Sequence, residues 1–496
     1  MRLLSVCLAA LVLAACSSSE GGGDDGPTAG QIPDKAGMTV KGIVKDSAGN
    51  GIAGVVVSDG LEVTATDERG IYYLASDLAR RNFVFVSVPA DCEIPATQGC
   101  PRFYRKIDRK QAVNRADFTL TRRKTPADRH SLIVMADIQL AADNTSVDSY
   151  LGHVVPDVLK TVQGLSTPVY GVSLGDLVWN DMSLFPKYRQ GLETLGFTTF
   201  SLPGNHDHDP AELTDSLALQ SYERYFGPAN YSVNIGKIHY LFLDNILFDH
   251  APTAEEEYTI GLTDEICRWI EADLRYVPAG STLVVSSHCP ILYHTKNTAA
   301  RNHRNFQRFL DAISPYKVHA FGGHKHYHDI YRYDDGRKVM HCIARTPGDL
   351  FINGDVNCDG TPRGYAVVEV DGERLSWYYK PAGGKRDMQM RLYAPGRTNS
   401  ACVYANVWGY DTAWSAVEWI PASGGQAVAM ERTQRTDPYY EEVLATGVRG
   451  GTPTNTGICS GSIRAASGAA WCGSPTVSGI PTNRPCPGKY DIRTKP

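Results

Sequence analysis

The chain has 496 residues, of which 42% are hydrophobic and 21% are charged, and its formal net charge is −5. This composition is typical of globular proteins, and the length is enough for about three domains. The sequence lacks a stripe of Lys and Arg, which disfavours a dedicated nucleic-acid partner, because binding along a phosphate backbone requires clustered positive charge.

The amino terminus contains an apolar run that closes with Leu13-Ala14-Ala15-Cys16. This run is too short to be a permanent membrane helix and is typical of an export signal. Its end resembles a bacterial lipobox, which implies cleavage before Cys16 and lipidation of that thiol. We therefore expect residues 1–15 to be a lipoprotein signal peptide and residues 16–36, rich in Ser, Gly and acidic residues, to be a flexible tether.

Lipidation at Cys16 would anchor the exported protein to a bacterial membrane. We expect this to be the outer membrane, with the protein facing the periplasm or the cell surface. The alternative is ordinary signal cleavage after a site of the A-x-A kind, without lipidation.

Residues 37–122 contain short apolar runs separated by turns rich in Gly, Asn and Asp, for example at residues 39–44, 55–57, 62–66, 70–74 and 83–88. Short strands at this close spacing predict a β-sandwich. The segment resembles the carboxypeptidase-regulatory or transthyretin-like domains of bacterial surface proteins. Such a domain is either a rigid spacer or, if exposed aromatic side chains cluster on it, a binding module.

Five polar groups in the middle of the chain each follow a short run rich in β-branched residues. They are, in order, Asp137-x-Gln139, Gly175-Asp176, Gly204-Asn205-His206-Asp207, His288 and Gly323-His324-x-His326. Helix-like stretches cover residues 148–162, 216–226, 263–276 and 303–313. This alternation predicts an α/β domain over residues 128–348, with the polar groups at the carboxyl ends of its strands, where α/β folds place their sites.

These residue types suit a two-metal hydrolytic site. Two divalent ions roughly 3.5–4 Å apart need a carboxylate that bridges them, further oxygens and imidazoles, and an open edge for a water and a phosphoryl oxygen. Asp176 is the candidate for the bridging carboxylate.

In this order the groups resemble the pattern D-x-H, G-D, G-N-H-[DE], H and G-H-x-H of the calcineurin-like metallophosphoesterase superfamily, over roughly residues 130–350. The resemblance implies an α/β fold with an α/β/β/α sandwich core, and metal-dependent hydrolysis of phosphate mono- or diesters. It assigns the first ion to Asp137, Gln139, Asp176 and His326. It assigns the second ion to Asp176, Asn205, His288 and His324. The two divalent ions would be Mn, Fe or Zn.

The resemblance also implies a mechanism in which a metal-bound hydroxide attacks phosphorus. His206 belongs to neither set of metal ligands. A histidine beside the ligand Asn205 can protonate the leaving-group oxygen as a general acid. Asp207 is expected to orient His206. The alternative is a non-catalytic surface binding lipoprotein that retains a metal core. A decayed site should have lost the bridge or the acid, whereas Asp176 and His206 are both present.

Two positions depart from the patterns of related enzymes. Gln139 stands where histidine is the usual ligand, and the neutral oxygen of its side chain can still bind an ion. Trp179 stands where purple acid phosphatases have the tyrosine that binds iron, so that ligand is missing. His208 and His328 lie beside the motifs and either line the substrate cleft or belong to surface loops.

After Pro347, runs at residues 365–370, 375–379 and 405–408 predict strands again. Residues 360–496 are expected to form a mainly-β domain that ends in an irregular, disulfide-rich tail. This segment resembles the C-terminal domain that accompanies calcineurin-like cores in exported bacterial proteins.

Of the 12 cysteines, Cys7 and Cys16 belong to the signal and anchor, and export makes the other ten candidates for disulfides. The expected pairs are Cys92 with Cys100 and Cys342 with Cys358. Two further bridges, in any of three connectivities, are expected among Cys402, Cys459, Cys472 and Cys486. The expected buried free thiols are Cys267 and Cys289.

Overall fold

The computed structural model describes most of the chain. The described residues are 32–142, 145–248, 258–292, 303–333, 336–348, 356–394, 402–411, 416–420, 426–433, 436–446, 462–465 and 491–495. The predicted signal peptide, Cys16 and most of the predicted tether lie outside them. Within the described ranges, the structure has no helix that is both long and apolar enough to cross a membrane.

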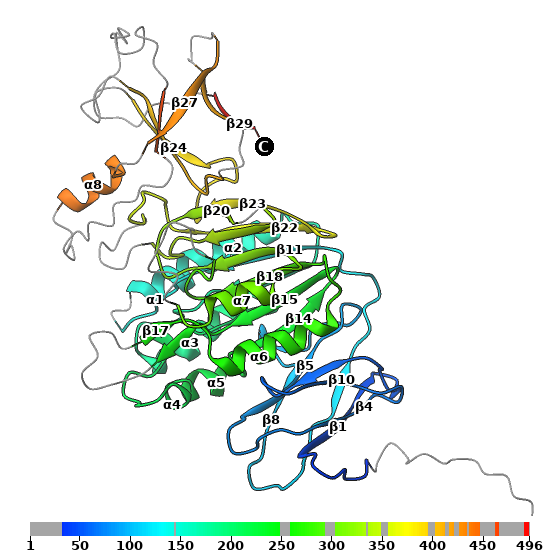
Figure 1. Cartoon of the computed structure of the whole chain (residues 1–496). Coiled ribbons are helices and arrows are strands. Elements are labelled where there is room, and N and C mark those ends of the chain that lie inside the picture. The colour runs from blue at the N-terminus through cyan, green and yellow to red at the C-terminus, as the bar shows by residue number, and fades with distance from the viewer. Residues whose placement is uncertain are drawn as a thin grey trace, which may run out of the picture.

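The N-terminal region consists mainly of two four-stranded sheets, as Figure 1 shows. Its strands are β1 (Val40–Asp46), β2 (Val56–Ser58), β3 (Val63–Ala65), β4 (Ile71–Leu74), β5 (Phe83–Ser87), β6 (Ala96–Thr97), β7 (Cys100–Pro101), β8 (Tyr104–Lys106), β9 (Asn114–Arg115) and β10 (Phe118–Leu120). One sheet has the order β10-β1-β4 with β9 beside β1, and the other has the order β3-β2-β5-β8. Ile32 is buried and Lys41 donates to its carbonyl oxygen, so the predicted tether ends before residue 32.

The core contains two mixed sheets. The first has, in order across the sheet, β13 (Thr199–Ser201), β12 (Val169–Ser173), β11 (Arg129–Met135), β22 (Gly364–Asp371) and β23 (Arg374–Pro381). The second has β14 (Tyr231–Ile235), β15 (Ile238–Leu243), β18 (Thr282–Ser287), β19 (Lys317–Gly322), β21 (Lys338–Cys342) and β20 (Asp329–Tyr333). A separate ribbon pairs β16 (Ile246–Phe248) with β17 (Tyr258–Ile260).

Helices cover the outer faces of both sheets (Figure 1). The first group is α1 (Thr145–Ser149), η1 (Tyr150–Val154), α2 (Val155–Val162), η2 (Met182–Leu184), α3 (Phe185–Leu195), α4 (Asp215–Ala218) and α5 (Gln220–Phe226), and the short η3 (Asn205–Asp207) lies in the turn after β13. The second group is α6 (Asp264–Asp273), η4 (Leu274–Tyr276) and α7 (Phe306–Ala312). Thr263 caps the N-terminus of α6, because its side chain accepts a hydrogen bond from the backbone N–H of Ile266.

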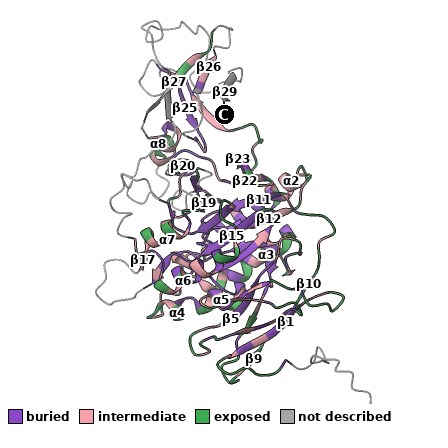
Figure 2. Cartoon of the chain, turned by 45° about the vertical axis from the view of Figure 1, so that its right-hand side comes forward, coloured by how far each residue is buried: buried purple, intermediate pink, exposed green. Residues whose placement is uncertain are grey.

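The packing of β11 explains the layered core. Successive side chains of a strand point to opposite faces. Leu132 and Val134 accordingly join the cluster between the sheets, whereas Ile133 and Met135 pack with the first group of helices. Both faces of β11 are therefore buried, which is why the last four residues of the strand, Leu132–Met135, are all apolar, and Figure 2 shows buried residues concentrated in the two sheets. These layers confirm the predicted calcineurin-like α/β core.

Residues 364–381, which were predicted to belong to the C-terminal domain, pair with the strands of the core. β22 pairs antiparallel with β11, and β23 pairs with β22, so both strands complete the first core sheet. The remaining C-terminal elements are β24 (Met390–Tyr393), β25 (Tyr404–Val407), β26 (Ala416–Ile420), β27 (Val428–Thr433), α8 (Pro438–Ala445), β28 (Ser462–Ala465) and β29 (Asp491–Lys495). They form a sheet of order β24-β25-β28-β27-β26-β29 at the end of the core opposite the N-terminal region (Figure 1).

The disulfides predicted from Cys92, Cys100 and Cys342 are not formed, because each of these residues is a buried free thiol. Cys92 and Cys100 pack in two different hydrophobic clusters, so their side chains are held apart. The thiol of Cys342 instead donates to the carbonyl oxygen of Gly323. Cys267 and Cys289 are buried free thiols, as predicted. Three other cysteines of the predicted bridges lie outside the described residues: Cys459, Cys472 and Cys486.

Candidate metal centre

The fold brings the five predicted polar groups to one place. They lie in the segments that follow β11, β12, β13, β18 and β19. Strands β11, β12 and β13 run parallel in the first sheet, and β18 and β19 run parallel in the second. The carboxyl ends of these strands therefore meet at one edge of the two-sheet core, which is where α/β folds bind ligands.

Backbone strain is concentrated at this edge. Among the described residues, eight other than glycine have a positive φ, and six of the eight belong to the site or border it. These six are Asp137, Gln139, Asp176, Asn180, His324 and His326. Each such conformation costs roughly 1–3 kcal/mol and is typical of functional sites. The motif glycines let the loops approach closely, since a Cβ at Gly204 would collide with the Asp176 carboxylate.

The second group of predicted ligands converges around Asn205. The Nδ1 atom of His288 lies 2.8 Å from the carbonyl oxygen of Leu174 and therefore donates to it. The Nε2 atom of the same ring then faces Asn205 Oδ1 at 3.0 Å and Asp176 Oδ1 at 3.3 Å. Nδ1 of His324 lies 3.1 Å from Asn205 Oδ1 and 3.2 Å from His288 Nε2.

This convergence fits a bound cation. When the ring of His288 is neutral, its hydrogen is on Nδ1 and Nε2 carries a lone pair. This lone pair faces the oxygens of Asn205 and Asp176, and a cation between these atoms would stabilise the arrangement. Burial lowers the pKa of His288, but the carboxylates of Asp176 and Asp137 outweigh it and raise the pKa above its ordinary value. This cluster of side chains around Asp176 therefore attracts positive charge. Candidate ligand atoms of Asp137, Asp176 and His288 all lie within 4.8 Å of one another.

The first group of predicted ligands surrounds Asp137. Its two carboxylate oxygens each lie 3.0 Å from the backbone nitrogen of His324, which donates to them. Nε2 of His326 lies 3.3 Å from Asp137 Oδ1. Gln139 is also present, but its amide nitrogen faces the cluster, 3.0 Å from Asp176 Oδ2 and 3.2 Å from His326 Nε2. Its amide oxygen points the other way and accepts a hydrogen bond from Nε of Arg345 at 2.7 Å.

His206 lies beside the cluster and is held by two residues that follow β12. Its ring stacks on Trp179 with centroids 3.7 Å apart, and its Nδ1 atom lies 2.9 Å from Asn180 Oδ1. The backbone N–H of Asn180 donates in turn to the carbonyl oxygen of His206. Nε2 of His206 is 3.9 Å from Asp176 Oδ2, so the ring faces the metal cluster. In the sequence, only one feature points to Asn180, which is its position four residues after the aspartate of the G-D motif.

The structure gives the carboxylate of Asp207 partners other than the ring of His206, which it was predicted to orient. This buried carboxylate accepts hydrogen bonds from the backbone N–H groups of Gly204, Leu177 and Val178, at 2.9 to 3.1 Å. It therefore ties the turn that carries Asn205 to the segment after Asp176. The acceptor for Nδ1 of His206 is Asn180, on a different loop.

His208 and His328 are both buried, so neither belongs to a surface loop nor faces an open cleft. Nδ1 of His208 lies 2.9 Å from the carbonyl oxygen of Gly204, and its Nε2 atom lies 3.6 Å from Asp244. Burial lowers the pKa of His208, but Asp244 and Asp215 outweigh it and raise the pKa to about 9. The ring of His328 packs against Tyr379.

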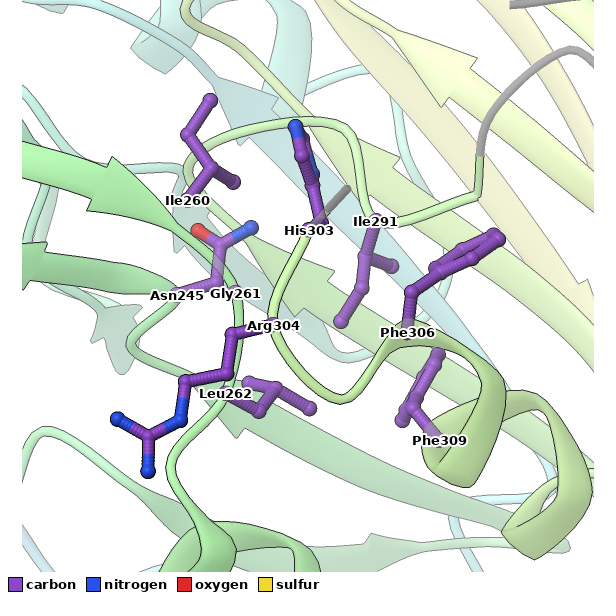
Figure 3. Close-up of a pocket in the computed structure, with 9 residues that line it drawn as sticks. All are labelled: Asn245, Ile260, Gly261, Leu262, Ile291, His303, Arg304, Phe306 and Phe309. Carbon is purple, nitrogen blue, oxygen red and sulfur yellow. The ribbon is translucent and has the colours of Figure 1, made fainter. Parts of the chain in front are cut away.

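A small pocket lies next to the segment that carries His288, and Figure 3 shows its lining. The lining residues are Asn245, Ile260, Gly261, Leu262, Ile291, His303, Arg304, Phe306 and Phe309. Its volume of about 10 Å³ is no more than one water molecule requires. Asn245 exchanges two hydrogen bonds with the backbone of Cys289, so this side chain fixes the segment directly after His288.

Three protein-family models match the chain. Residues 131–328 match the family model for calcineurin-like phosphoesterase. Residues 38–123 match the model for the N terminal of calcineurin-like phosphoesterase, and residues 341–453 match the model for its C terminal. No protein of curated function matches the chain in sequence.

Several solved structures are similar to the chain at low identity. A dimetal phosphatase from Danio rerio is 13% identical, with 51% of this chain and 96% of that chain covered and a TM-score of 0.38. The structure of PhoD is 9% identical, with 72% and 84% covered and a TM-score of 0.39. A 5′-nucleotidase precursor from Thermus thermophilus is 13% identical, with 51% and 54% covered and a TM-score of 0.30.

The three family models follow one another along the chain in the order of the three structural regions, and the central one spans all five polar motifs. The chain therefore belongs to the calcineurin-like phosphoesterase family, and this membership supports metal-dependent hydrolysis of phosphate esters.

Proposed function

We propose that the protein hydrolyses phosphate mono- or diesters at a two-metal centre, with His206 as the general acid. The observation that carries the proposal is the convergence of lone-pair atoms at the carboxyl ends of the strands, above all His288 Nε2 facing Asn205 Oδ1 and Asp176 Oδ1. The groups that would bind the ions are carboxylates, one amide oxygen and imidazoles, and these ligand types suit Mn, Fe or Zn.

Two ions would be held by two sets of residues, and Asp176 would belong to both sets. The first set is Asp137, Asp176 and His326, and the second is Asp176, Asn205, His288 and His324. When bound, the two ions supply an activated water and neutralise the charge that develops on the phosphoryl oxygens. The imidazoles of His288 and His206 outweigh the opposing effect of burial and lower the pKa of Asp176 to about 2, so this carboxylate is ionised at neutral pH.

The chain itself would supply the proton for the leaving group. Asn180 accepts the hydrogen on Nδ1 of His206, and the stacked ring of Trp179 restricts rotation of the imidazole. These two contacts keep Nε2 directed toward the metal cluster. A proton on Nε2 is then in position to pass to the leaving-group oxygen of a bound ester.

A panel of phosphate mono- and diesters, assayed with and without added Mn²⁺, tests the proposal. We expect turnover that depends on the metal and is lost on chelation. Asp176→Asn is the matched control, because removing the bridging charge should weaken both ions together and abolish the metal-dependent turnover. A protein that binds two ions yet hydrolyses no ester in the panel would contradict the proposal and favour a non-catalytic binding protein.

We also propose that the protein is exported and anchored to the outer membrane through Cys16. The support is the sequence Leu13-Ala14-Ala15-Cys16, which resembles a lipobox. Residues 17–31 lie between Cys16 and the first described residue and are long enough to serve as a tether, at most roughly 50 Å when fully extended.

A further inference from the structure

The contact between Gln139 and Arg345 determines what Gln139 can offer to a metal ion. Arg345 follows β21, and the residue is only 2% exposed. Its Nε–H group donates to Oε1 of Gln139 at 2.7 Å. Gln139 is equally buried, at 1% exposure, so solvent has little access to either partner.

The chemistry of the two groups fixes the orientation of the amide. A guanidinium has donors and no acceptor, so the atom of Gln139 that faces Arg345 must be the amide oxygen. The amide nitrogen then faces Asp176 Oδ2 at 3.0 Å and His326 Nε2 at 3.2 Å. This nitrogen donates hydrogen bonds and has no lone pair for a metal ion.

The opposite orientation is unfavourable while Arg345 is in place. Rotating the amide of Gln139 by half a turn would set its NH₂ group against the Nε–H group of Arg345, donor against donor. Each buried donor left without an acceptor costs roughly 1–3 kcal/mol. The rotated amide would gain one oxygen–metal contact in exchange for the hydrogen bonds to Arg345 and Asp176.

We propose that Arg345 withholds the oxygen of Gln139 from the first metal position. Gln139 is then a positioning residue that donates to Asp176, and the first ion relies on Asp137, Asp176 and His326. The inference rests on the proposed two-metal centre. Its consequence is an asymmetric site, in which the first ion has fewer protein ligands than the second and leaves more readily.

Metal binding by three variants tests this inference directly. Gln139→Ala should retain the metal content of the native protein after dialysis against a weak chelator. Arg345→Met should free the amide to rotate and tighten the first ion by about tenfold, the scale on which groups around metal ligands act. The double variant Gln139→Ala/Arg345→Met should lose that gain. Calorimetric titration with Mn²⁺ measures the affinities, and Gln163→Ala, at an exposed glutamine, is the matched control.

One result would overturn the inference: a folded Gln139→Ala protein that loses one ion and keeps the other, since this would identify Gln139 as a ligand. If Arg345→Met fails to fold, Gln139→Ala decides the question alone. Ester hydrolysis is scored separately. Native protein with two ions and no hydrolysis would contradict the proposed function, whereas the metal content of Gln139→Ala would still decide the role of Gln139.

Discussion

At the scale of single residues, His206 is the side chain whose role is most open to direct test. It lies outside the proposed ligand sets, and its ring is held by Trp179 and Asn180. His206→Asn should therefore retain both ions and lower kcat by roughly 10²–10⁴, the usual contribution of a general acid. The loss should be smaller for nitrophenyl esters, whose leaving groups scarcely need a proton. Equal losses on alkyl and nitrophenyl esters would argue against the acid role.

Asn180 should act through His206, because its side-chain oxygen accepts the hydrogen on Nδ1. Asn180→Ala should lower kcat by about tenfold, the scale of a group that orients a functional side chain. Asn180→Asp keeps an acceptor at the same place and should recover most of the activity. Steady-state kinetics on alkyl and nitrophenyl esters provide the measurement. Full activity in Asn180→Ala would show that the ring of His206 does not depend on this hydrogen bond.

The motifs were sufficient to predict which side chains the structure brings together, because each motif directly follows a strand whose end lies at the site. The roles of Gln139 and Asp207 were not predictable in the same way. Arg345, the partner of Gln139, lies 206 residues further along the chain and belongs to no motif. Asp207 looks suited to orient its neighbour His206, yet its carboxylate binds three backbone N–H groups instead.

At the scale of elements, the helix α5 carries a glutamate that couples stability to pH. Glu223 accepts a hydrogen bond from Asn82 of the N-terminal region, and burial raises its pKa to about 7 from an ordinary value of 4.5. The folded state thus binds a proton more tightly than the unfolded state. Stability from this group is fully present below about pH 4.5 and is lost as the pH rises through about 7.

The free energy of unfolding should therefore fall by on the order of 2–3 kcal/mol between about pH 5 and about pH 8 because of Glu223. Glu223→Gln carries no charge and should lack this decline. Urea denaturation of the metal-free protein at several pH values measures the slope. Glu193→Gln, at an exposed glutamate on α3, is the control and should keep the native slope. Identical slopes in the native protein and Glu223→Gln would contradict the assignment.

Strand pairing shows where sequence periodicity stops being informative. The apolar pattern of residues 365–370 and 375–379 predicts strands, and β22 and β23 occur there. Nothing in that pattern identifies the partner strand, because alternation describes the two faces of a strand and not its edges. β22 pairs with β11, whose sequence lies more than 200 residues earlier, so the core extends past the boundary expected at residue 360.

At the scale of the whole molecule, specific contacts connect the N-terminal region to the core. Val88 of this region bridges to Val233, the side chains of Ser87 and Ser232 are hydrogen-bonded, and the ring of Phe85 packs edge-on against Trp269. At the other end, Arg332 of the core pairs with Asp411 of the C-terminal region. Along the sequence the N-terminal region follows the proposed anchor at Cys16 and precedes the core, and in the structure it lies at the end of the core opposite the C-terminal sheet (Figure 1).

The proposed membrane anchor depends on a single side chain, the thiol of Cys16. If the thiol of Cys16 carries the lipid, Cys16→Ser should move the protein from membranes to the soluble fraction, because multiple acyl chains are what make such binding stable. Incorporation of labelled palmitate should be lost as well. Cys7→Ser, which changes a cysteine inside the apolar run, is the matched control and should leave the protein on membranes. A Cys16→Ser protein that still sediments with membranes and incorporates palmitate would show that the anchor lies elsewhere.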